Sequence, residues 1–290
     1  MLVAGATGAV GSMLVHKLLA AGITVRALGR NREKLDALAA AGAQSVHIDL
    51  LDRDAVARAC EGVGQVFSSA NNVMGHGKSS PMRIDVAAHE SLIAGARAAV
   101  VDRFVYLSAR GMTADSPVDF FRTKHAIDKM VSTSGIPFVL IRPTAFMDIW
   151  VEILADGIRK NSTTVLFGDG KAISNYVAGD DVAEIAARIL MQPDVRNEII
   201  EVGGPSNVSL VQLATLVERH LGVQAKRRHI PKPVLWAGGL LLKPFNEVAA
   251  RLMRMGYFTT LDRSFTDSAG VTRRFGVSPI ALETFLERLA

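Results

Sequence analysis

The chain has 290 residues, of which 49% are hydrophobic and 21% charged, so its composition is that of a globular protein and excludes a disordered chain. The formal charge of +5 comes without a dense run of Lys and Arg, which argues against a nucleic-acid-binding face. The single cysteine, Cys60, excludes an intrachain disulfide and a cysteine-based zinc site, and we expect it to be buried. No apolar stretch reaches the roughly 20 residues that span a bilayer, and no leader peptide is recognisable, so we expect a soluble cytoplasmic protein.

Short apolar runs alternate with helical patterns in the first half of the chain. We expect strands at residues 1–4, 24–28, 45–48, 65–69, 104–107 and 138–141, and helices at 9–21, 32–41, 53–60, 84–99 and 121–134. Such alternation is typical of a parallel sheet that is covered by helices on both faces. We therefore predict an α/β protein whose residues 1–145 form a Rossmann-type domain with a doubly wound parallel sheet.

The rhythm changes after Pro143. We expect helices at 146–159, 180–191 and 209–221, strands at 164–167, 174–177 and 199–202, and a broken helical region over 231–256. This mixture predicts a smaller C-terminal α+β region over 146–290, which forms a substrate or lid region and contributes some elements to the sheet.

The strongest functional signal is the turn Gly5-Ala6-Thr7-Gly8-Ala9-Val10-Gly11, which follows the first strand and opens the first helix. Glycines allow a tight turn and a close approach of the backbone to a pyrophosphate. The free N–H groups at the helix start and the positive end of the helix dipole favour that anion. The turn therefore predicts a nicotinamide dinucleotide site.

The end of the second strand distinguishes the two nicotinamide dinucleotides. NAD-binding Rossmann folds place a carboxylate there for the ribose 2′-hydroxyl, whereas this chain has Gly29-Arg30-Asn31-Arg32-Glu33-Lys34. A guanidinium pairs well with a 2′-phosphate, so we expect NADP(H) to be favoured over NAD(H), with Arg30 and Lys34 as binding residues. The alternative is that these are solvated charges at the start of a helix.

Several motifs together resemble the NmrA-like branch of the atypical short-chain dehydrogenases/reductases. Besides the glycine turn and Arg30, they are Asp49-Leu50, Phe104-Val105-Tyr106-Leu107-Ser108, Phe120-Phe121-Arg122-Thr123-Lys124, Ile141-Arg142-Pro143-Thr144 and Gly168-Asp169-Gly170-Lys171. The resemblance covers most of the first 190 positions and becomes loose over the last hundred. It implies that Asp49 and Leu50 meet the adenine, that Ser69, Ala70, Pro143 and Thr144 border the cofactor, and that Lys124 hydrogen-bonds the nicotinamide ribose. It also implies catalytic roles for Lys124 and Ser108.

One position departs from the family. The catalytic pattern of the superfamily is Tyr-x-x-x-Lys, but Phe120 stands four residues before Lys124, and a phenyl ring cannot donate a proton. Three other side chains are candidate proton donors: His76, His125 and Tyr176. The alternative for each is that it is an ordinary surface or core residue. Quinone reduction needs no protein acid, because the hydroquinone anion is stabilised and water can protonate it.

The sequence is compatible with three functions. The first is an NADP(H)-dependent oxidoreductase that reduces quinones or similar small apolar electrophiles, under an apolar cover from Phe146, Trp150, Trp236 and Phe245, which are equally plausible as core residues. The second is a non-catalytic NADP(H) redox sensor of the NmrA type. The third, an epimerase or dehydratase of nucleotide sugars, is disfavoured by the missing tyrosine. We expect no metal site and no nucleic-acid partner, and either a monomer or a homodimer.

Overall fold

The computed structural model describes residues 1–265 and 267–288. These residues divide into two compact units. Unit 1 comprises Met1–Arg142 and Val182–Glu201, and unit 2 comprises Pro143–Asp181 and Val202–Ala290. The first junction lies close to the boundary expected from the sequence, and the chain later returns to unit 1 for one further segment.

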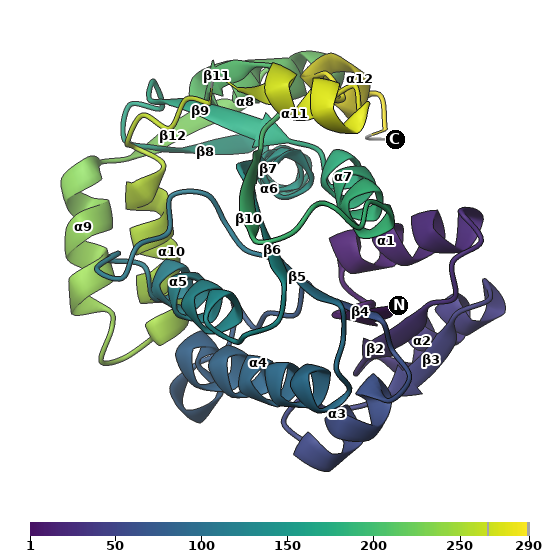
Figure 1. Ribbon diagram of the computed structural model, residues 1–290. Helices are drawn as coiled ribbons and strands as arrows, with labels where there is room; N and C mark the ends of the chain where they lie inside the picture. The colour runs from purple at the N-terminus through teal and green to yellow at the C-terminus, as the bar shows by residue number, and fades with distance from the viewer. Residues whose placement is uncertain (266, 289–290) are drawn as a thin grey trace. The chain divides into compact units, whose positions relative to one another are not determined.

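Unit 1 is built on a seven-stranded sheet with the strand order β10-β6-β5-β4-β1-β2-β3 (Figure 1). Its strands are β1 (Leu2–Ala4), β2 (Arg26–Gly29), β3 (Gln44–His47), β4 (Gln65–Ser68), β5 (Arg103–Leu107), β6 (Phe138–Pro143) and β10 (Glu198–Val202). The neighbouring pairs from β3 through to β6 are parallel. The order reverses between β1 and β4, and doubly wound sheets bind ligands beyond the strand ends at such a switch point. The predicted Rossmann-type fold is confirmed.

Helices cover both faces of this sheet, which explains why its central strands are mostly apolar. They are α1 (Ala9–Ala20), α2 (Arg32–Ala40), α3 (Arg53–Cys60), the 3-10 helix η1 (Gly77–Ser79), α4 (Pro81–Ala98), α5 (Asp119–Ser132) and α7 (Gly179–Met191). In Figure 1, α3, α4 and α5 lie on one side of the sheet and α1 lies on the other. Val56, Leu92 and Ile127 of the first group pack with Phe104 and Tyr106 of β5 in one buried core.

A buried arginine joins the returning segment of the chain to unit 1. Arg103 of β5 is 3% exposed, and its guanidinium donates to the carbonyl oxygens of Leu190 at 3.0 Å and Gln192 at 2.7 Å, and to that of Val195. Gln65 Oε1 accepts from the same guanidinium at 2.7 Å. These bonds hold the end of α7 beside β4 and β5, and β10 then joins the sheet next to β6.

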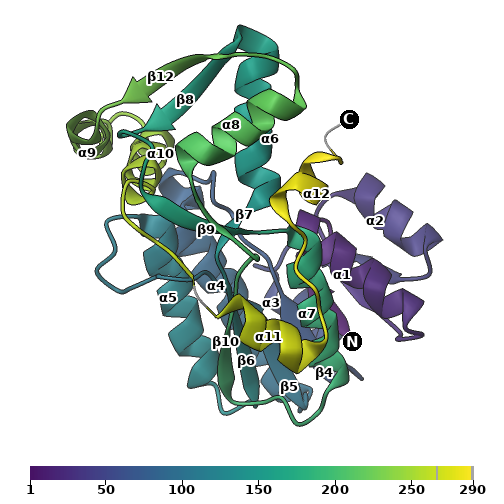
Figure 2. The same ribbon diagram turned by 90° about the horizontal axis from the view of Figure 1, so that it is seen from above.

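The described residues of unit 2 form two small sheets and six helices. Its strands are β7 (Ala145–Phe146), β8 (Thr163–Phe167), β9 (Ile173–Val177), β11 (Asn207–Ser209) and β12 (Lys226–Ile230), and its helices are α6 (Met147–Asn161), α8 (Leu210–His220), α9 (Lys232–Leu241), α10 (Glu247–Phe258), α11 (Ser268–Phe275) and α12 (Leu282–Leu286). The strand β12 pairs in parallel with β8, and α6 and α8 lie beside this pair (Figure 2).

The core of unit 2 forms where α6 and α8 pack together. Met147, Leu154, Leu213 and Val217 from these helices surround Leu166 of β8. A capping box starts α8, because Ser209 Oγ accepts from the Gln212 amide at 3.2 Å and Gln212 Oε1 accepts from the Ser209 amide at 2.7 Å. None of the helices in the described part of the chain has the length and apolarity to cross a membrane.

Candidate active site

The glycine turn connects β1 to α1 at the switch point. Gly5 has φ +80°, and a Cβ at this position would lie 2.7 Å from the amide nitrogen of Ala70, which follows β4. A Cβ on Gly11 would overlap the carbonyl oxygen of Gly5. Two of the three glycines are therefore required by the packing of the chain itself, which brings β1, α1 and the end of β4 into close contact.

The middle glycine faces outward. Gly8 is exposed and has φ −81°, and a Cβ there would meet only the Gly5 carbonyl oxygen, at 3.3 Å. Among the described residues no side chain caps α1, and its first turn contains no acidic residue. The amide groups of Ala9, Val10 and Gly11 at the helix start are thus suited to bind an anion. The turn fits a dinucleotide pyrophosphate.

The segment after β2 carries the two expected cations. Gly29 allows close contact with Thr7, because a Cβ at position 29 would lie 2.6 Å from Thr7 Cγ2. Arg30 and Lys34 are both exposed, and Lys34 Nζ lies 3.5 Å from the Thr7 carbonyl oxygen. Positive charge is therefore available next to the glycine turn.

The other candidate cofactor residues of unit 1 follow strands of the same sheet. Ser69, after β4, donates its amide to the Ala4 carbonyl oxygen at 3.0 Å, and Asp49, after β3, is exposed and accepts from the Leu51 amide at 3.0 Å. Leu50 beside it packs against the core. Because parallel strands end at one edge of a sheet, these residues and the glycine turn lie along the same edge.

Two candidates lie at or beyond the end of β6. Pro143 is the last residue of β6. Thr144 belongs to unit 2, where its hydroxyl donates to Asn175 Oδ1 at 2.9 Å and its amide donates to the Val202 carbonyl oxygen. The Thr144 hydroxyl is therefore already engaged within unit 2.

Lys124 is held at the end of β5. Its Nζ donates to the Leu107 carbonyl oxygen at 2.8 Å and lies 4.7 Å from the centre of the Tyr106 ring and 5.7 Å from that of Phe120. The side chain is buried, and burial lowers the pKa of Lys124 to about 8 against the opposing effect of the Asp85 and Asp128 carboxylates. An ammonium group of this kind is a strong donor for a hydroxyl brought close to it.

A buried carboxylate lies one turn further along α5. Asp128 Oδ2 accepts from Arg142 Nε at 3.1 Å and Nη2 at 3.0 Å. Burial raises the pKa of Asp128, and the Arg142 guanidinium opposes that shift. Three buried atoms in this cluster, Tyr106 OH, Ser108 Oγ and Asp128 Oδ1, have no hydrogen-bond partner among the described residues. Unsatisfied buried polar atoms are uncommon in folded proteins and mark this cluster as a functional candidate.

The polar cluster continues into α4. His89 is fully buried, and its two ring nitrogens lie 2.9 Å from Ser68 Oγ and 2.6 Å from the Asp85 carbonyl oxygen. Its ring meets Tyr106 edge-on at 4.9 Å. Burial lowers the pKa of His89 to about 4, so the imidazole is neutral at pH 7.

Lys124 and Ser108 of this polar cluster were expected from the sequence, but Asp128, His89 and the Tyr106 hydroxyl were not. One signal was available, since Lys124 and Asp128 are spaced four residues apart and therefore lie on one face of α5. His89 gave no comparable signal, because a histidine in an alanine-rich helical stretch reads as an ordinary helix residue.

The other candidate proton donors differ in their surroundings. Tyr176 is 3% exposed, packs 6.3 Å from Trp150 in the core of unit 2, and has a pKa raised by burial to about 12, so it is a core residue. His76 is exposed and His125 is half-buried. Cys60 is buried, with a pKa raised by burial to about 11, which fits the expected packing role.

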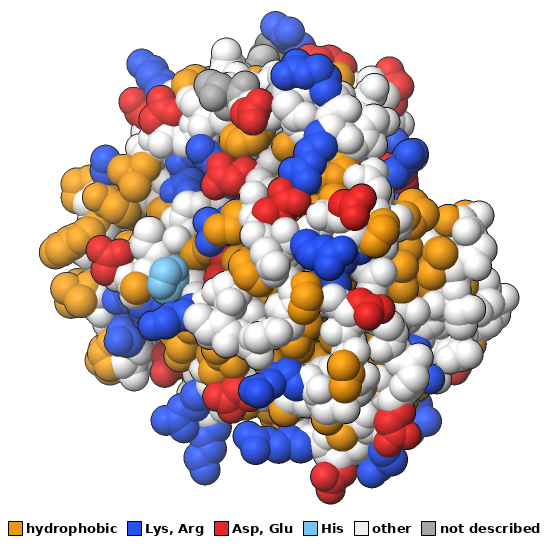
Figure 3. Space-filling view, viewed as in Figure 1, with side chains coloured by type: hydrophobic (Ala, Val, Ile, Leu, Met, Phe, Trp, Pro, Cys, Tyr) orange, Lys and Arg blue, Asp and Glu red, His pale blue; other side chains and the backbone are white. Residues whose placement is uncertain are grey.

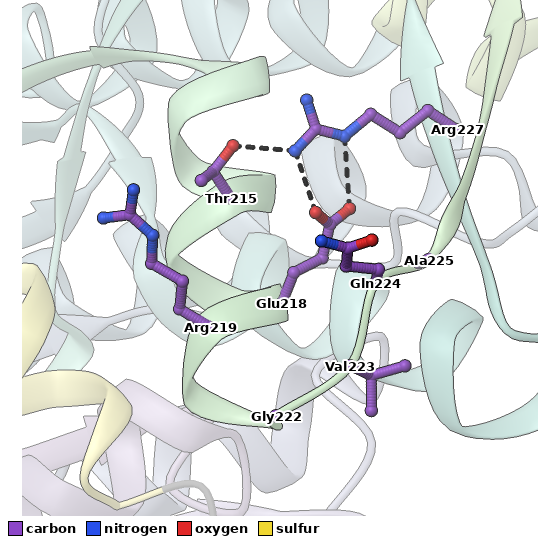
Figure 4. Close-up of a pocket in the computed structure, with 8 residues that line it drawn as sticks. All are labelled: Thr215, Glu218, Arg219, Gly222, Val223, Gln224, Ala225 and Arg227. Carbon is purple, nitrogen blue, oxygen red and sulfur yellow. Dashed lines mark hydrogen bonds and ion pairs between the residues drawn. The ribbon is translucent and has the colours of Figure 1, made fainter.

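A hollow of about 540 Å³ lies on unit 2. Its lining residues fall between Thr215 and Arg227, and none of them is a candidate cofactor residue. Figure 4 shows that a double ion pair occupies its centre, with Arg227 Nη2 2.8 Å from Glu218 Oε2 and Arg227 Nε 3.2 Å from Glu218 Oε1. Thr215 accepts a further bond from Arg227 at 2.7 Å. These groups satisfy one another. Over the described ranges, no three His, Cys, Asp or Glu side chains are grouped so that they could hold a metal ion.

Comparisons with known proteins agree with this geometry. Residues 5–193 match the model of a family described as NAD(P)H-binding. The NAD(P)H azoreductase of Xenophilus azovorans is 29% identical over 77% of this chain and 74% of its own length, and Quinone oxidoreductase 2 of Escherichia coli is 27% identical over 79% and 77%. The NADPH complex of the Escherichia coli NADPH-dependent quinone oxidoreductase superposes with a TM-score of 0.79 at 23% identity over 99% of each chain. The chain therefore belongs to the NAD(P)H-binding family, in agreement with its resemblance to the atypical short-chain dehydrogenases/reductases.

Proposed function

We propose that this protein is an NADPH-dependent reductase of quinones or similar small apolar electrophiles. The observation that carries the proposal is the phenyl ring of Phe120 beside the Lys124 ammonium, in a chain of the NAD(P)H-binding family. Such a site lacks the usual proton donor. It therefore suits substrates whose reduced anion is stable enough to take its proton from water. The named activities of the azoreductase and quinone oxidoreductase relatives support this substrate class.

The preference for NADPH rests on charge at the end of β2. Arg30 and Lys34 supply two exposed cations there, residues 29–31 at the strand end contain no carboxylate, and Glu33 lies in the first turn of α2. A 2′-phosphate would pair with these groups, whereas the 2′-hydroxyl of NADH would leave them without a ligand. The glycine turn would hold the pyrophosphate, and Asp49 and Leu50 would border the adenine.

NADPH supplies a hydride, and the quinone takes up that hydride and one proton to give the hydroquinone. The protein would bind and orient the two molecules. The Lys124 ammonium, which donates one bond to the Leu107 carbonyl, would donate another to a ribose hydroxyl. Ser108 Oγ, which is buried after β5, would be a second donor for a ligand oxygen.

A redox sensor is the second candidate. The same phenyl ring favours it, because a protein that only binds NADP(H) and does not oxidise it needs no proton donor.

One experiment separates the two functions. Purified protein is mixed with NADPH and a panel of quinones, while calorimetry measures binding and absorbance follows the reduced nicotinamide. We expect tight binding together with turnover. Tight binding without turnover of any quinone would support the sensor instead.

A further inference from the structure

The net positive charge of the chain is concentrated in one short segment. The chain contains 33 Lys and Arg and 28 Asp and Glu, and residues 226–246 contain five of the former and none of the latter. Removing these five leaves 28 basic against 28 acidic residues, so the rest of the chain is balanced. A sequence of 21 residues thus accounts for the whole charge of +5.

This segment forms β12, α9 and the connection to α10, all in unit 2. Lys226 and Arg228 are exposed on β12, and Lys232 and Lys243 are exposed at the two ends of α9. Arg227 is the exception, because its guanidinium pairs with Glu218. Four cations therefore face solvent along this stretch.

The same segment exposes large apolar side chains. Phe245 is 88% exposed, Leu241 67%, Trp236 61%, Leu240 55% and Val234 50%. We call these five side chains the apolar tip. Hydrophobic side chains gather over α9 at the left edge of Figure 3. A single soluble domain rarely exposes such a group of aromatic and branched side chains without a binding role.

The inner face of α9 explains why these side chains cannot turn inward. Leu235 is fully buried, and Gly239 lies so close to α10 that a Cβ would sit 2.5 Å from Arg254 Cγ. A Cβ on Gly256 of α10 would lie 2.9 Å from Phe167 Cδ1 and 3.1 Å from Leu235 Cδ2. Glycines therefore form the close contact between α9 and α10, and the large apolar side chains of α9 lie on the opposite, exposed side.

We propose that the apolar tip and its flanking cations dock this protein peripherally on an anionic lipid bilayer. Trp and Phe insert favourably at the interface between headgroups and acyl chains, and nearby Lys and Arg pair with anionic headgroups. A second copy of the chain fits less well, because a symmetric contact would place the same four cations against one another. The segment contains no acid to relieve that repulsion.

The test uses the full chain with vesicles of phosphatidylcholine containing phosphatidylglycerol, and with pure phosphatidylcholine vesicles. We expect co-flotation with the anionic vesicles that weakens as salt rises. The chain has two tryptophans, so in a Trp150→Phe background the fluorescence of Trp236 should shift to the blue on binding.

Paired variants separate the two contributions. Trp236→Ser with Phe245→Ser, and Arg228→Glu with Lys243→Glu, should each lower vesicle partitioning by about tenfold or more. The matched controls are Val100→Ser, an exposed apolar residue of unit 1, and Arg97→Glu with Lys129→Glu, which change the charge equally on α4 and α5; both should partition like the wild type. Circular dichroism confirms that each variant is folded.

The proposal is overturned if the folded wild type fails to bind anionic vesicles at low salt, or if binding survives both paired changes. It is also overturned if the wild type is a dimer in solution that Phe245→Ser dissociates and that does not bind vesicles, because the apolar tip would then be a contact between copies.

Discussion

The ammonium nitrogen of Lys124 lies 5.7 Å from the centre of the Phe120 ring and 2.8 Å from the carbonyl oxygen of Leu107. The aromatic residue one turn before the lysine thus occupies the expected place on α5 but has no hydroxyl. The lysine ammonium instead donates a hydrogen bond to the backbone of β5. The site therefore keeps the lysine ammonium but lacks the phenol of the Tyr-x-x-x-Lys pattern.

Replacing Phe120 by tyrosine tests that separation. Phe120→Tyr should leave quinone turnover within about twofold of wild type, because no acid is used there, and should introduce weak reduction of ketones by restoring a phenol near Lys124. Steady-state kinetics with one quinone and one aryl ketone measure both effects. A phenol that raised quinone turnover strongly would show that proton delivery already limits the wild type.

The glycines of the turn should respond differently to substitution. Gly8→Val should reduce dinucleotide affinity more than about tenfold with little change in melting temperature, since the added side chain points to the exposed side of the turn. Gly11→Val should instead destabilise the fold, because its Cβ would overlap the Gly5 carbonyl. Calorimetry and thermal unfolding distinguish the two. Unchanged affinity in folded Gly8→Val would remove the glycine turn from the binding site.

Arg30 should read the 2′-phosphate. Arg30→Ala should weaken NADPH about 10- to 150-fold and NADH little, which corresponds to the roughly 1.5–3 kcal/mol of a charge-assisted hydrogen bond. Arg32→Ala removes an exposed guanidinium two residues away and is the matched control. Equal losses for NADPH and NADH in the Arg30 variant, or an equal effect of Arg32→Ala, would assign the phosphate to another group.

The buried imidazole of His89 should make the fold sensitive to acid. Its pKa is lowered to about 4 in the folded chain against about 6.5 in an unfolded one. The unfolded state therefore binds the extra proton first, and stability falls as the pH drops from about 6.5 towards 4. Between pH 7 and pH 5, wild type should lose about 2 kcal/mol of unfolding free energy relative to His89→Gln. Urea unfolding at the two pH values measures this, and parallel curves for the two proteins would contradict it.

The sequence predicted the parts of the fold that depend on local pattern. Apolar runs between helical stretches were sufficient for the sheet from β1 to β6, because strands that are covered on both faces are rich in apolar residues. The β12 strand was missed, since Lys226, Arg227, Arg228 and His229 give it no apolar alternation. It is a strand because it pairs in parallel with β8, and that pairing is not visible in the local sequence.

The candidate site shows the same division. The glycine turn and Arg30 could be recognised from spacing, because the dinucleotide chemistry is local to β1, α1 and the end of β2. The pairing of Asp128 with Arg142 joins α5 to β6, and the contact of His89 with Tyr106 joins α4 to β5. Such contacts depend on tertiary packing between elements, so a single sequence gives them no pattern.

The proposed site transfers reducing equivalents from NADPH to acceptors that need no protein acid. The most direct measurement compares NADPH oxidation by a 1,4-benzoquinone with that by an equally hydrophobic aryl ketone, using wild type and Gly8→Val. We predict turnover with the quinone, none with the ketone, and loss of quinone turnover in the variant at NADPH concentrations that saturate the wild type. Reduction of the ketone at a rate comparable with the quinone would contradict the account, because a proton donor would then be present in the site.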